Sequence, residues 1–225
     1  MTPPPPFLSA PFLFDLDGTL ADTLPDIAAS VNHVRSRHSL APLALAVVRN
    51  FVGDGARTLV ARALAEVLPD GAVARERALD LAFAEYGTHH GTQCTVHAKW
   101  FPGVREHLEL LRARGHGLAV VTNKPERFAR AIVQHLGAAD VFGALVGGDT
   151  LPQKKPDPAP VRHALALLGW RGGGATIVGD GVQDLRAGKA AGVRTIACLF
   201  GYGSPAKLKE EGADEYWSAF GVVAG

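Results

Sequence analysis

The sequence has few cysteines, no surplus of charge of either sign and no long apolar run. Its 225 residues include only two cysteines, Cys94 and Cys198, which lie far apart and in no metal-binding spacing. A disulfide framework and a zinc site are therefore not indicated, and a reducing cytoplasm fits best. Lys and Arg number 23 against 22 Asp and Glu, so the formal net charge is +1. Such a chain has no broad field to attract nucleic acid or an anionic membrane.

Two further absences concern membranes and export. No apolar stretch approaches the roughly 20 residues that span a bilayer, so we expect a soluble protein without a membrane partner. The first residues, MTPPPPFLSAP, lack the basic region and the unbroken apolar core of a signal peptide. Their prolines favour an extended chain, and residues 1–10 are predicted to form a flexible tail. The remaining length suffices for one sizeable domain, or for a core domain with a smaller insertion.

Short apolar runs alternate with longer helical patterns over most of the chain. The runs are PFLFDL from Pro11, GLAVVTN from Gly117, ALVGGD from Ala144, ATIVGD from Ala175 and VRTIACLF from Val193. Their continuous hydrophobicity is typical of strands that are buried on both faces of a parallel sheet. Amphipathic helical segments such as VREHLELLRARG and ERFARAIVQHLG lie between them. The pattern predicts an α/β fold with a Rossmann-like parallel sheet flanked by helices.

One segment breaks the alternation. Residues 24–96 contain amphipathic stretches, such as GARTLVARALAEVL from Gly55 and VARERALDLAFAEYG from Val73, with no convincing strand between them. We interpret this segment as a small helical cap inserted after the first strand. The α/β core then comprises residues 11–23 and 97–225.

Polar side chains gather where the predicted strands end. The first run ends in Asp15 and Asp17, the second in Thr122 and Asn123, and the fourth in Asp180. Asp184 follows one helical turn later. In open parallel sheets, ligands bind at the carboxyl ends of the strands, where these groups would meet. Four carboxylates at one edge need raised pKa values or a compensating cation, and oxygen ligands at an open site favour Mg²⁺.

The loop LPQKKPDPAP adds a positive side chain to this group. Lys155 lies in a proline-rich segment that could hold its ammonium in place. Carboxylates, a divalent metal, the hydroxyl of Thr122 and a lysine together make a site for a phosphoryl group. Asp15 could then attack phosphorus and form an acyl phosphate that water later cleaves.

Four ordered motifs carry a resemblance to a known family. DLDGTLADT, VVTNKP, KKPDPAP and VGDGVQDLRAGKAAG resemble the motifs of the haloacid dehalogenase superfamily of phosphotransferases, and the resemblance covers Phe12 to about Gly203. Within that superfamily, GDGARTLVARAL, WFPGV, TNKPERF and GGDTLPQKKPDP look most like the bacterial phosphoglycolate phosphatases. The resemblance implies a phosphomonoester hydrolase whose substrate is a small phosphorylated metabolite.

The resemblance also implies roles for individual residues. Asp15 would be the nucleophile, and Asp17 the general acid that protonates the leaving group and then the base that activates water. Mg²⁺ would be held by Asp15, by the backbone carbonyl of Asp17 and by Asp180. Asp184 would support this metal shell.

The phosphoryl group would be bound by Thr122, with Asn123 beside it, and neutralised by Lys155. One departure is visible, because Gly181 follows Asp180 where many members of the superfamily carry serine. We therefore expect no hydroxyl contribution at position 181.

The cap offers candidates for selecting the substrate. In resembling proteins the loop before Arg57 faces the active site, so Arg57 is a candidate partner for a substrate carboxylate, although a solvent-facing helix arginine is an equally good interpretation. Lys124 and Arg62 are further candidates of the same kind. The histidines at positions 89, 90 and 97 fall in no metal-binding spacing and receive no role.

Two alternatives stay open at this point. A phosphate-accepting receiver domain also gathers carboxylates, a threonine and a lysine on a parallel sheet, although it needs neither a second acid two residues after the nucleophile nor a long helical insertion. Within the enzyme interpretation, pyrophosphate, a sugar phosphate, a nucleotide or a phosphomutase substrate would use the same core motifs. The sequence leaves the choice between a monomer and a homodimer open.

Overall fold

A computed structural model describes residues 8–220, so residues 1–7 of the predicted tail and residues 221–225 lie outside the described part. Its main feature is a six-stranded sheet with the order β5-β4-β1-β6-β7-β8, in which every pairing is parallel. The strands are β1 Ser9–Phe14, β4 His116–Val121, β5 Ala144–Val146, β6 Thr176–Gly179, β7 Arg194–Cys198 and β8 Glu215–Trp217. The predicted parallel α/β core is confirmed.

The first strand begins earlier than the sequence indicated. Ser9 pairs with His116 of β4, so Ser9 and Ala10 belong to β1 and not to the tail. Neighbouring residues of the inner strands enter different hydrophobic clusters, because successive strand side chains point to opposite faces. Leu13 packs in one cluster and Phe14 in another, and Ala119 and Val120 divide in the same way.

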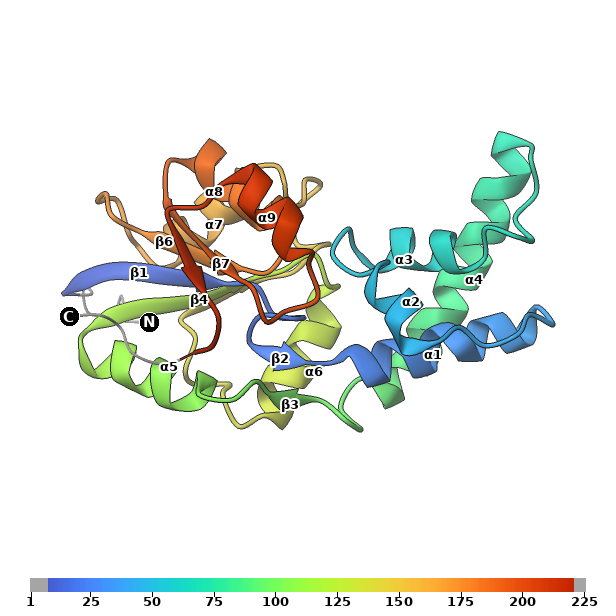
Figure 1. The fold of residues 1–225 in the computed structure, drawn as a ribbon, viewed down its shortest axis with the longest axis horizontal. Coiled ribbons are helices and arrows are strands. Elements are labelled where there is room, and N and C mark those ends of the chain that lie inside the picture. The colour runs from blue at the N-terminus through green and yellow to red at the C-terminus, as the bar shows by residue number, and fades with distance from the viewer. Residues whose placement is uncertain (1–7, 221–225) are drawn as a thin grey trace.

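Helices cover both faces of this sheet (Figure 1). The core helices are α5 Val104–Ala113, α6 Glu126–His135, α7 Ala159–Leu167, α8 Val182–Ala191 and α9 Pro205–Glu211. Leu108 and Leu111 of α5 and Ile132 of α6 share the cluster of Phe14, whereas Val161 of α7 shares the cluster of Leu13. The two faces are thus buried by different helices, which explains the continuous hydrophobicity of the strands.

Residues between Ala21 and Trp100 form a separate helical layer beside the sheet (Figure 1). Its helices are α1 Leu24–Arg37, α2 Leu45–Arg49, α3 Ala56–Ala63 and α4 Ala72–Gln93. They bury an apolar cluster of their own, which includes Val31, Leu64 and Tyr86. A short antiparallel pair, β2 Ala21–Asp22 with β3 Lys99–Trp100, joins the two connections between this layer and the core.

The sequence did not predict every element. The strands β2, β3 and β8 have only two or three residues, too few to show a hydrophobic period. The helix α4 extends well beyond the predicted segment, to Gln93. Within residues 8–220, no helix has the length and apolar character that crossing a membrane requires.

Candidate active site

Three adjacent strands end in polar residues that face one another. Asp15 follows β1, Thr122 follows β4 and Asp180 follows β6, and β1 lies between the other two strands. The backbone continues the sheet for one more residue, since the N–H of Asp15 donates to Val178 O and that of Thr122 donates to Val146 O, each at 2.9 Å. The strand register therefore fixes where these side chains begin.

Three buried carboxylates form the centre of the site. One carboxylate oxygen from each of Asp15, Asp180 and Asp184 lies within 4.8 Å of the others. The ammonium of Lys155, which is 1% exposed, lies 3.1 Å from Asp15 Oδ1 and 2.5 Å from Asp184 Oδ1. One buried cation thus faces three carboxylates, so the group can accommodate a further positive charge.

The pKa values reflect this excess of negative charge. Burial, with Asp15 and Asp184 close by, raises the pKa of Asp180 to about 7. Burial also raises the pKa of Asp184 above its usual range, although Lys155 opposes the shift. Burial alone would lower the pKa of Lys155, but Asp15 and Asp184 together raise it. A hard cation bound to these oxygens would relieve the repulsion.

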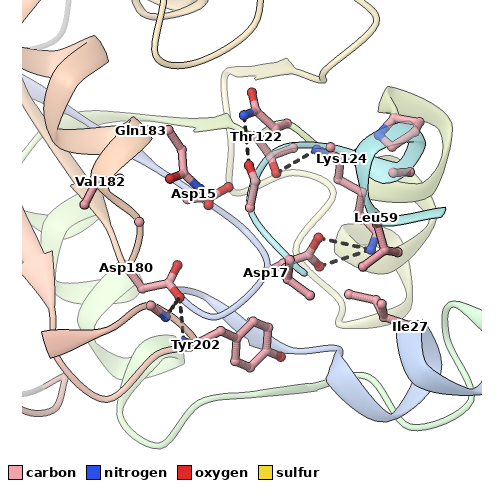
Figure 2. Close-up of a pocket in the computed structure, with 18 of the residues that line it drawn as sticks. Asp15, Asp17, Ile27, Leu59, Thr122, Lys124, Asp180, Val182, Gln183 and Tyr202 are labelled. Atoms are coloured by element: carbon pink, nitrogen blue, oxygen red, sulfur yellow. Dashed lines mark hydrogen bonds and ion pairs between the residues drawn. The ribbon is translucent and has the colours of Figure 1, made fainter. Parts of the chain in front are cut away.

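Asp180 is held in place by groups from two loops. Its Oδ1 accepts a hydrogen bond from Thr19 Oγ1 at 3.0 Å, and its Oδ2 accepts from the backbone N–H groups of Tyr202 at 2.6 Å and Gly203 at 3.1 Å (Figure 2). A Cβ at Gly203 would overlap the carbonyl oxygen of Asp180, so this close approach requires glycine. The carboxylate is thus oriented before any ligand binds.

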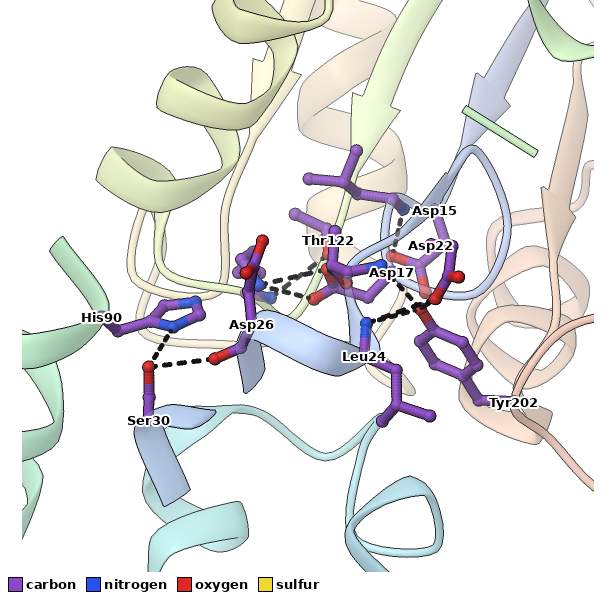
Figure 3. A network of polar contacts seen from close by, with 12 residues as sticks. Asp15, Asp17, Asp22, Leu24, Asp26, Ser30, His90, Thr122 and Tyr202 are labelled. Atoms are coloured by element: carbon purple, nitrogen blue, oxygen red, sulfur yellow. Dashed lines mark hydrogen bonds and ion pairs between the residues drawn. The ribbon is translucent and has the colours of Figure 1, made fainter. Parts of the chain in front are cut away.

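Asp17 lies on the outer side of this group and has different partners. Both of its carboxylate oxygens lie 3.1 Å from the Lys124 ammonium, and Oδ1 also accepts from Thr23 Oγ1 at 2.5 Å (Figures 2 and 3). The backbone N–H of Lys124 donates to Thr122 Oγ1 at 3.2 Å. The carboxylate of Asp17 is therefore directed toward Lys124 and Thr23 at the edge of an open space, rather than into the buried cluster.

That space is a pocket of about 180 Å³ between the sheet and the helical layer. Its core side includes Asp15, Asp17, Thr122, Lys124, Phe128 and Asp180. Its other side includes Ile27, Val52, Leu59, Tyr86 and His90 from the helical layer. A ligand at the carboxylates is thus partly enclosed by apolar side chains of α1, α3 and α4.

Comparisons with known proteins agree with this geometry. The family model described as haloacid dehalogenase-like hydrolase matches residues 12–198. The chain belongs to this family. A phosphoglycolate phosphatase of Psychrobacter arcticus is 36% identical over 94% of this chain and 92% of that protein. A phosphoglycolate phosphatase of Rhodospirillum rubrum is 43% identical over 84% of this chain and 79% of that protein. The crystal structure of a predicted phosphoglycolate phosphatase from Haemophilus somnus 129pt is 30% identical, covers 93% of this chain and 94% of that chain, and has a TM-score of 0.83.

In this haloacid dehalogenase-like hydrolase, the side chain of Asn123 binds other parts of the protein, whereas the sequence predicted that it binds the phosphoryl group beside Thr122. Its side-chain amide donates to Gly53 O and to Lys155 O, both at 2.9 Å, and its Oδ1 accepts from Lys155 N at 2.9 Å. Both amide hydrogens are therefore used within the protein. Asn123 joins the loop of Lys155 to the helical layer, and its side-chain amide has no hydrogen left for a phosphate.

Arg57 and Arg62 do not reach the pocket of the hydrolase. Arg57 forms ion pairs with Glu76 and Asp80 of α4, both at 2.6 Å, and these pairs raise its pKa. Arg62 pairs with Asp54 and donates to a backbone carbonyl of the same loop. The structure therefore contradicts Arg57 as a pocket residue, because acidic residues of its own layer hold it elsewhere.

Several residues of the site escaped the sequence analysis. Thr19 and Thr23 lie within the first motif, and their spacing from Asp17 could have suggested hydrogen bonds. No local pattern indicates Tyr202 or His90, because both reach the site only through tertiary packing. Tyr202 binds the connection to the helical layer, and His90 lines the pocket (Figure 3).

Proposed function

We propose that the chain is a magnesium-dependent phosphomonoester hydrolase that acts through an aspartyl-phosphate intermediate, with 2-phosphoglycolate as its substrate. One observation carries the proposal: Asp15 lines the pocket, 3.1 Å from the Lys155 ammonium and beside two further buried carboxylates. A carboxylate nucleophile needs this neutralisation to approach a phosphate dianion.

In the first step, an oxygen of Asp15 attacks phosphorus and the bond from phosphorus to the ester oxygen breaks. Asp17 gives its proton to that departing oxygen, so glycolate leaves as the free alcohol. In the second step Asp17 takes a proton from water, whose oxygen attacks phosphorus and releases phosphate and the Asp15 carboxylate. Thr122 donates its hydroxyl hydrogen to a phosphoryl oxygen in both steps, and Lys155 neutralises the phosphoryl group.

The carboxylate cluster suits a hard cation. Asp15, Asp180 and the backbone carbonyl of Asp17 would hold Mg²⁺, and Asp184 would support the shell through Lys155 and through its hydrogen bond from Gly181 N at 3.0 Å. When bound, the ion supplies positive charge to the phosphoryl oxygens.

The size of the pocket supports a small substrate. Pockets for drug-sized ligands occupy about 300–1,000 Å³, whereas this one has about 180 Å³. This volume suits a small phosphate ester better than a nucleotide. The relatives named as phosphoglycolate phosphatases support phosphoglycolate over pyrophosphate, a sugar phosphate or a phosphomutase substrate. The family counts against a receiver domain, as does the helical layer over the pocket.

We also propose that residues 24–96 act as a cap on a core formed by residues 11–23 and 97–225. The apolar cluster of α1–α4 and the position of Ile27, Leu59 and Tyr86 over the carboxylates support this division. Closure of such a cap would exclude water from the acyl phosphate until Asp17 activates one molecule. The two buried thiols, Cys94 and Cys198, are free, as suits the reducing cytoplasm in which we propose the enzyme acts.

The test is a comparison of kcat/KM for phosphoglycolate, pyrophosphate, hexose phosphates and nucleoside monophosphates, with and without magnesium. We expect magnesium-dependent release of phosphate with a clear preference for phosphoglycolate. A preference for another ester would contradict the substrate, and turnover without any divalent metal would contradict the mechanism. Single-turnover trapping of labelled phosphate on wild type, and its absence in Asp15→Asn, would identify the nucleophile.

A further inference from the structure

The pocket contains little positive charge with which to recognise the second anionic group of phosphoglycolate. Among its described lining residues, only Lys124 and Lys207 carry a cationic side chain. Lys207 is exposed on α9, where water screens its charge, whereas the side chain of Lys124 is 5% exposed. Lys155 lies beneath the carboxylates, where it faces Asp15 and Asp184.

His90 is not a substitute cation. Its Nδ1 lies 2.9 Å from Ser30 Oγ, a hydroxyl that also contacts Asp26 O and His89 Nδ1 (Figure 3). The other ring nitrogen, Nε2, is buried and has no hydrogen-bond partner among residues 8–220. Burial lowers the pKa of His90 to about 2, so the ring stays neutral.

The position of Lys124 matches the chemistry of the substrate. Asp17 must lie within hydrogen-bond distance of the ester oxygen to protonate it, and the Lys124 ammonium lies 3.1 Å from both oxygens of Asp17. In phosphoglycolate a single methylene separates the ester oxygen from the carboxylate. The carboxylate is therefore carried to the neighbourhood of Lys124 whenever the ester oxygen is placed at Asp17.

Lys124 also has the donor capacity for this contact. An ammonium has three hydrogens, and within residues 8–220 its hydrogen bonds are to Asp17 Oδ1 and Oδ2. One hydrogen is left for a ligand. On the cap side of the pocket the ammonium faces apolar side chains such as Ile27 and Leu59, where an ion pair with a substrate is less screened than in water (Figure 2).

We propose that Lys124 binds the carboxylate of the substrate and at the same time positions Asp17, so that it selects esters with an anionic tail. This inference rests on the proposed function and names the residue that gives the site its specificity. It replaces Arg57, which the structure places in ion pairs with α4.

The experiment compares phosphoglycolate with 2-hydroxyethyl phosphate, an ester of nearly the same shape whose tail is uncharged. The quantity is the ratio of their kcat/KM values in wild type, Lys124→Met and the matched control Lys207→Met. We expect Lys124→Met to lower this ratio at least about tenfold, equivalent to about 1.4 kcal/mol, and Lys207→Met to leave it unchanged. Both esters should also lose rate in Lys124→Met because Asp17 loses its partner.

The outcomes separate the two proposals. A wild type that does not favour phosphoglycolate would contradict the proposed substrate. A wild type that favours it, with an unchanged ratio in Lys124→Met, would overturn the role of Lys124 alone and leave the substrate standing. Inhibition by inorganic phosphate provides the folding control, because its binding site at Thr122 and Lys155 is intact in Lys124→Met. An unchanged inhibition constant with a reduced ratio is the expected result.

Discussion

Asp15 and Asp17 are two residues apart, yet their surroundings suit them to different tasks. Asp15 is buried, accepts a hydrogen bond from Leu16 N at 2.7 Å and faces Lys155. Asp17 is partly exposed to the pocket and faces Thr23 and Lys124. A fixed, neutralised carboxylate suits a nucleophile, and a carboxylate beside the pocket suits proton transfer to and from a ligand.

Replacement of Asp17 by Asn removes the transferable proton but keeps the size of the side chain. We expect kcat to fall by about 10²- to 10⁴-fold, the usual range for loss of a general acid or base. Circular dichroism and the melting temperature should show an intact fold. Asp157→Asn is the matched control, because Asp157 is exposed and, within residues 8–220, its carboxylate accepts only from the N–H of Ala159. An unchanged kcat in Asp17→Asn would refute the role of Asp17.

The raised pKa of Asp180, about 7, predicts how pH affects magnesium binding. The ion must displace a proton below that pH, so at pH 5.5 the apparent affinity should be roughly thirtyfold lower than the limit at high pH. The rise of the melting temperature with magnesium should therefore be larger at pH 8 than at pH 5.5. The same rise at both values would contradict this expectation, and Asp180→Asn should show little rise at either.

Without magnesium, the protonation of Asp180 makes the folded state less stable, not more stable, as pH rises. Between pH 3.8, the ordinary pKa of the group, and about 7, the folded state keeps a proton on Asp180 that the unfolded chain releases. This group therefore destabilises the metal-free protein as pH rises through that window.

At the scale of elements, the connection from β1 to α1 depends on a residue that is distant in the sequence. The hydroxyl of Tyr202 accepts hydrogen bonds from Thr23 N at 2.7 Å and Leu24 N at 2.9 Å, and it donates to Asp22 Oδ1 at 2.9 Å (Figure 3). Thr23 makes no side-chain cap for α1. Tyr202 thus satisfies the first free N–H group of the helix and fixes the start of the helical layer.

Tyr202→Phe removes these three hydrogen bonds. Thr23 N then loses its acceptor, and Leu24 N keeps only the longer contact to Asp22 Oδ1 at 3.4 Å. We expect a loss of about 1–3 kcal/mol in the free energy of unfolding, measured by urea titration. Tyr216→Phe is the control, since among the described residues the exposed Tyr216 hydroxyl accepts only from Ala213 N. This substitution should cost less than about 0.5 kcal/mol. A loss in Tyr202→Phe no larger than in the control would contradict the role of this hydroxyl.

Elements with a long, continuous apolar pattern could be predicted from the sequence, and those without one could not. The strands β1, β4, β6 and β7 are buried on both faces, so each showed as an apolar run. The strand β8 was missed because only three residues pair with β7 and its tyrosine is exposed. The pair of β2 and β3 depends on residues nearly eighty positions apart, which no local pattern reveals.

At the scale of the whole molecule, a few polar contacts join the helical layer to the core. Arg49 of α2 donates to the backbone carbonyls of Gly201 and Tyr202. The loop before α3 is held by Asn123 at Gly53 O and by Lys154 at Asp54 O. These contacts surround the pocket, so movement of the layer would have to break them.

Arg49→Ala should loosen this attachment without unfolding the protein. We expect faster backbone hydrogen exchange in α2 and α3, a change of less than about 1 kcal/mol in overall stability because Arg49 is exposed, and a two- to fivefold rise in KM. Arg105→Ala, at an exposed pair with Glu109 on α5, is the control and should not alter exchange in the helical layer. Unchanged exchange in α2 and α3 would show that Arg49 does not hold the layer.

The arrangement of the whole molecule explains which site residues could be recognised from the sequence. Asp15, Thr122 and Asp180 follow neighbouring strands, so the sheet itself brings them together, as their positions after apolar runs suggested. The position of the Arg57 side chain depends on which acidic residues lie nearest to it. The packing of α3 against α4 decides which residues those are. Asn123 lines the pocket, but its hydrogen bonds are set by loops from distant parts of the chain.

The position of β1 between β4 and β6 has a consequence for synthesis of the chain. Asp15 leaves the ribosome well over a hundred residues before Lys155 and Asp180. Throughout that stretch of synthesis, a nascent chain carries Asp15 without the lysine and the carboxylate that lie beside it in the folded protein. If Asp15 and Asp180 hold Mg²⁺ as proposed, the ion cannot guide folding before Asp180 is made, and its binding would report that β6 has joined the sheet.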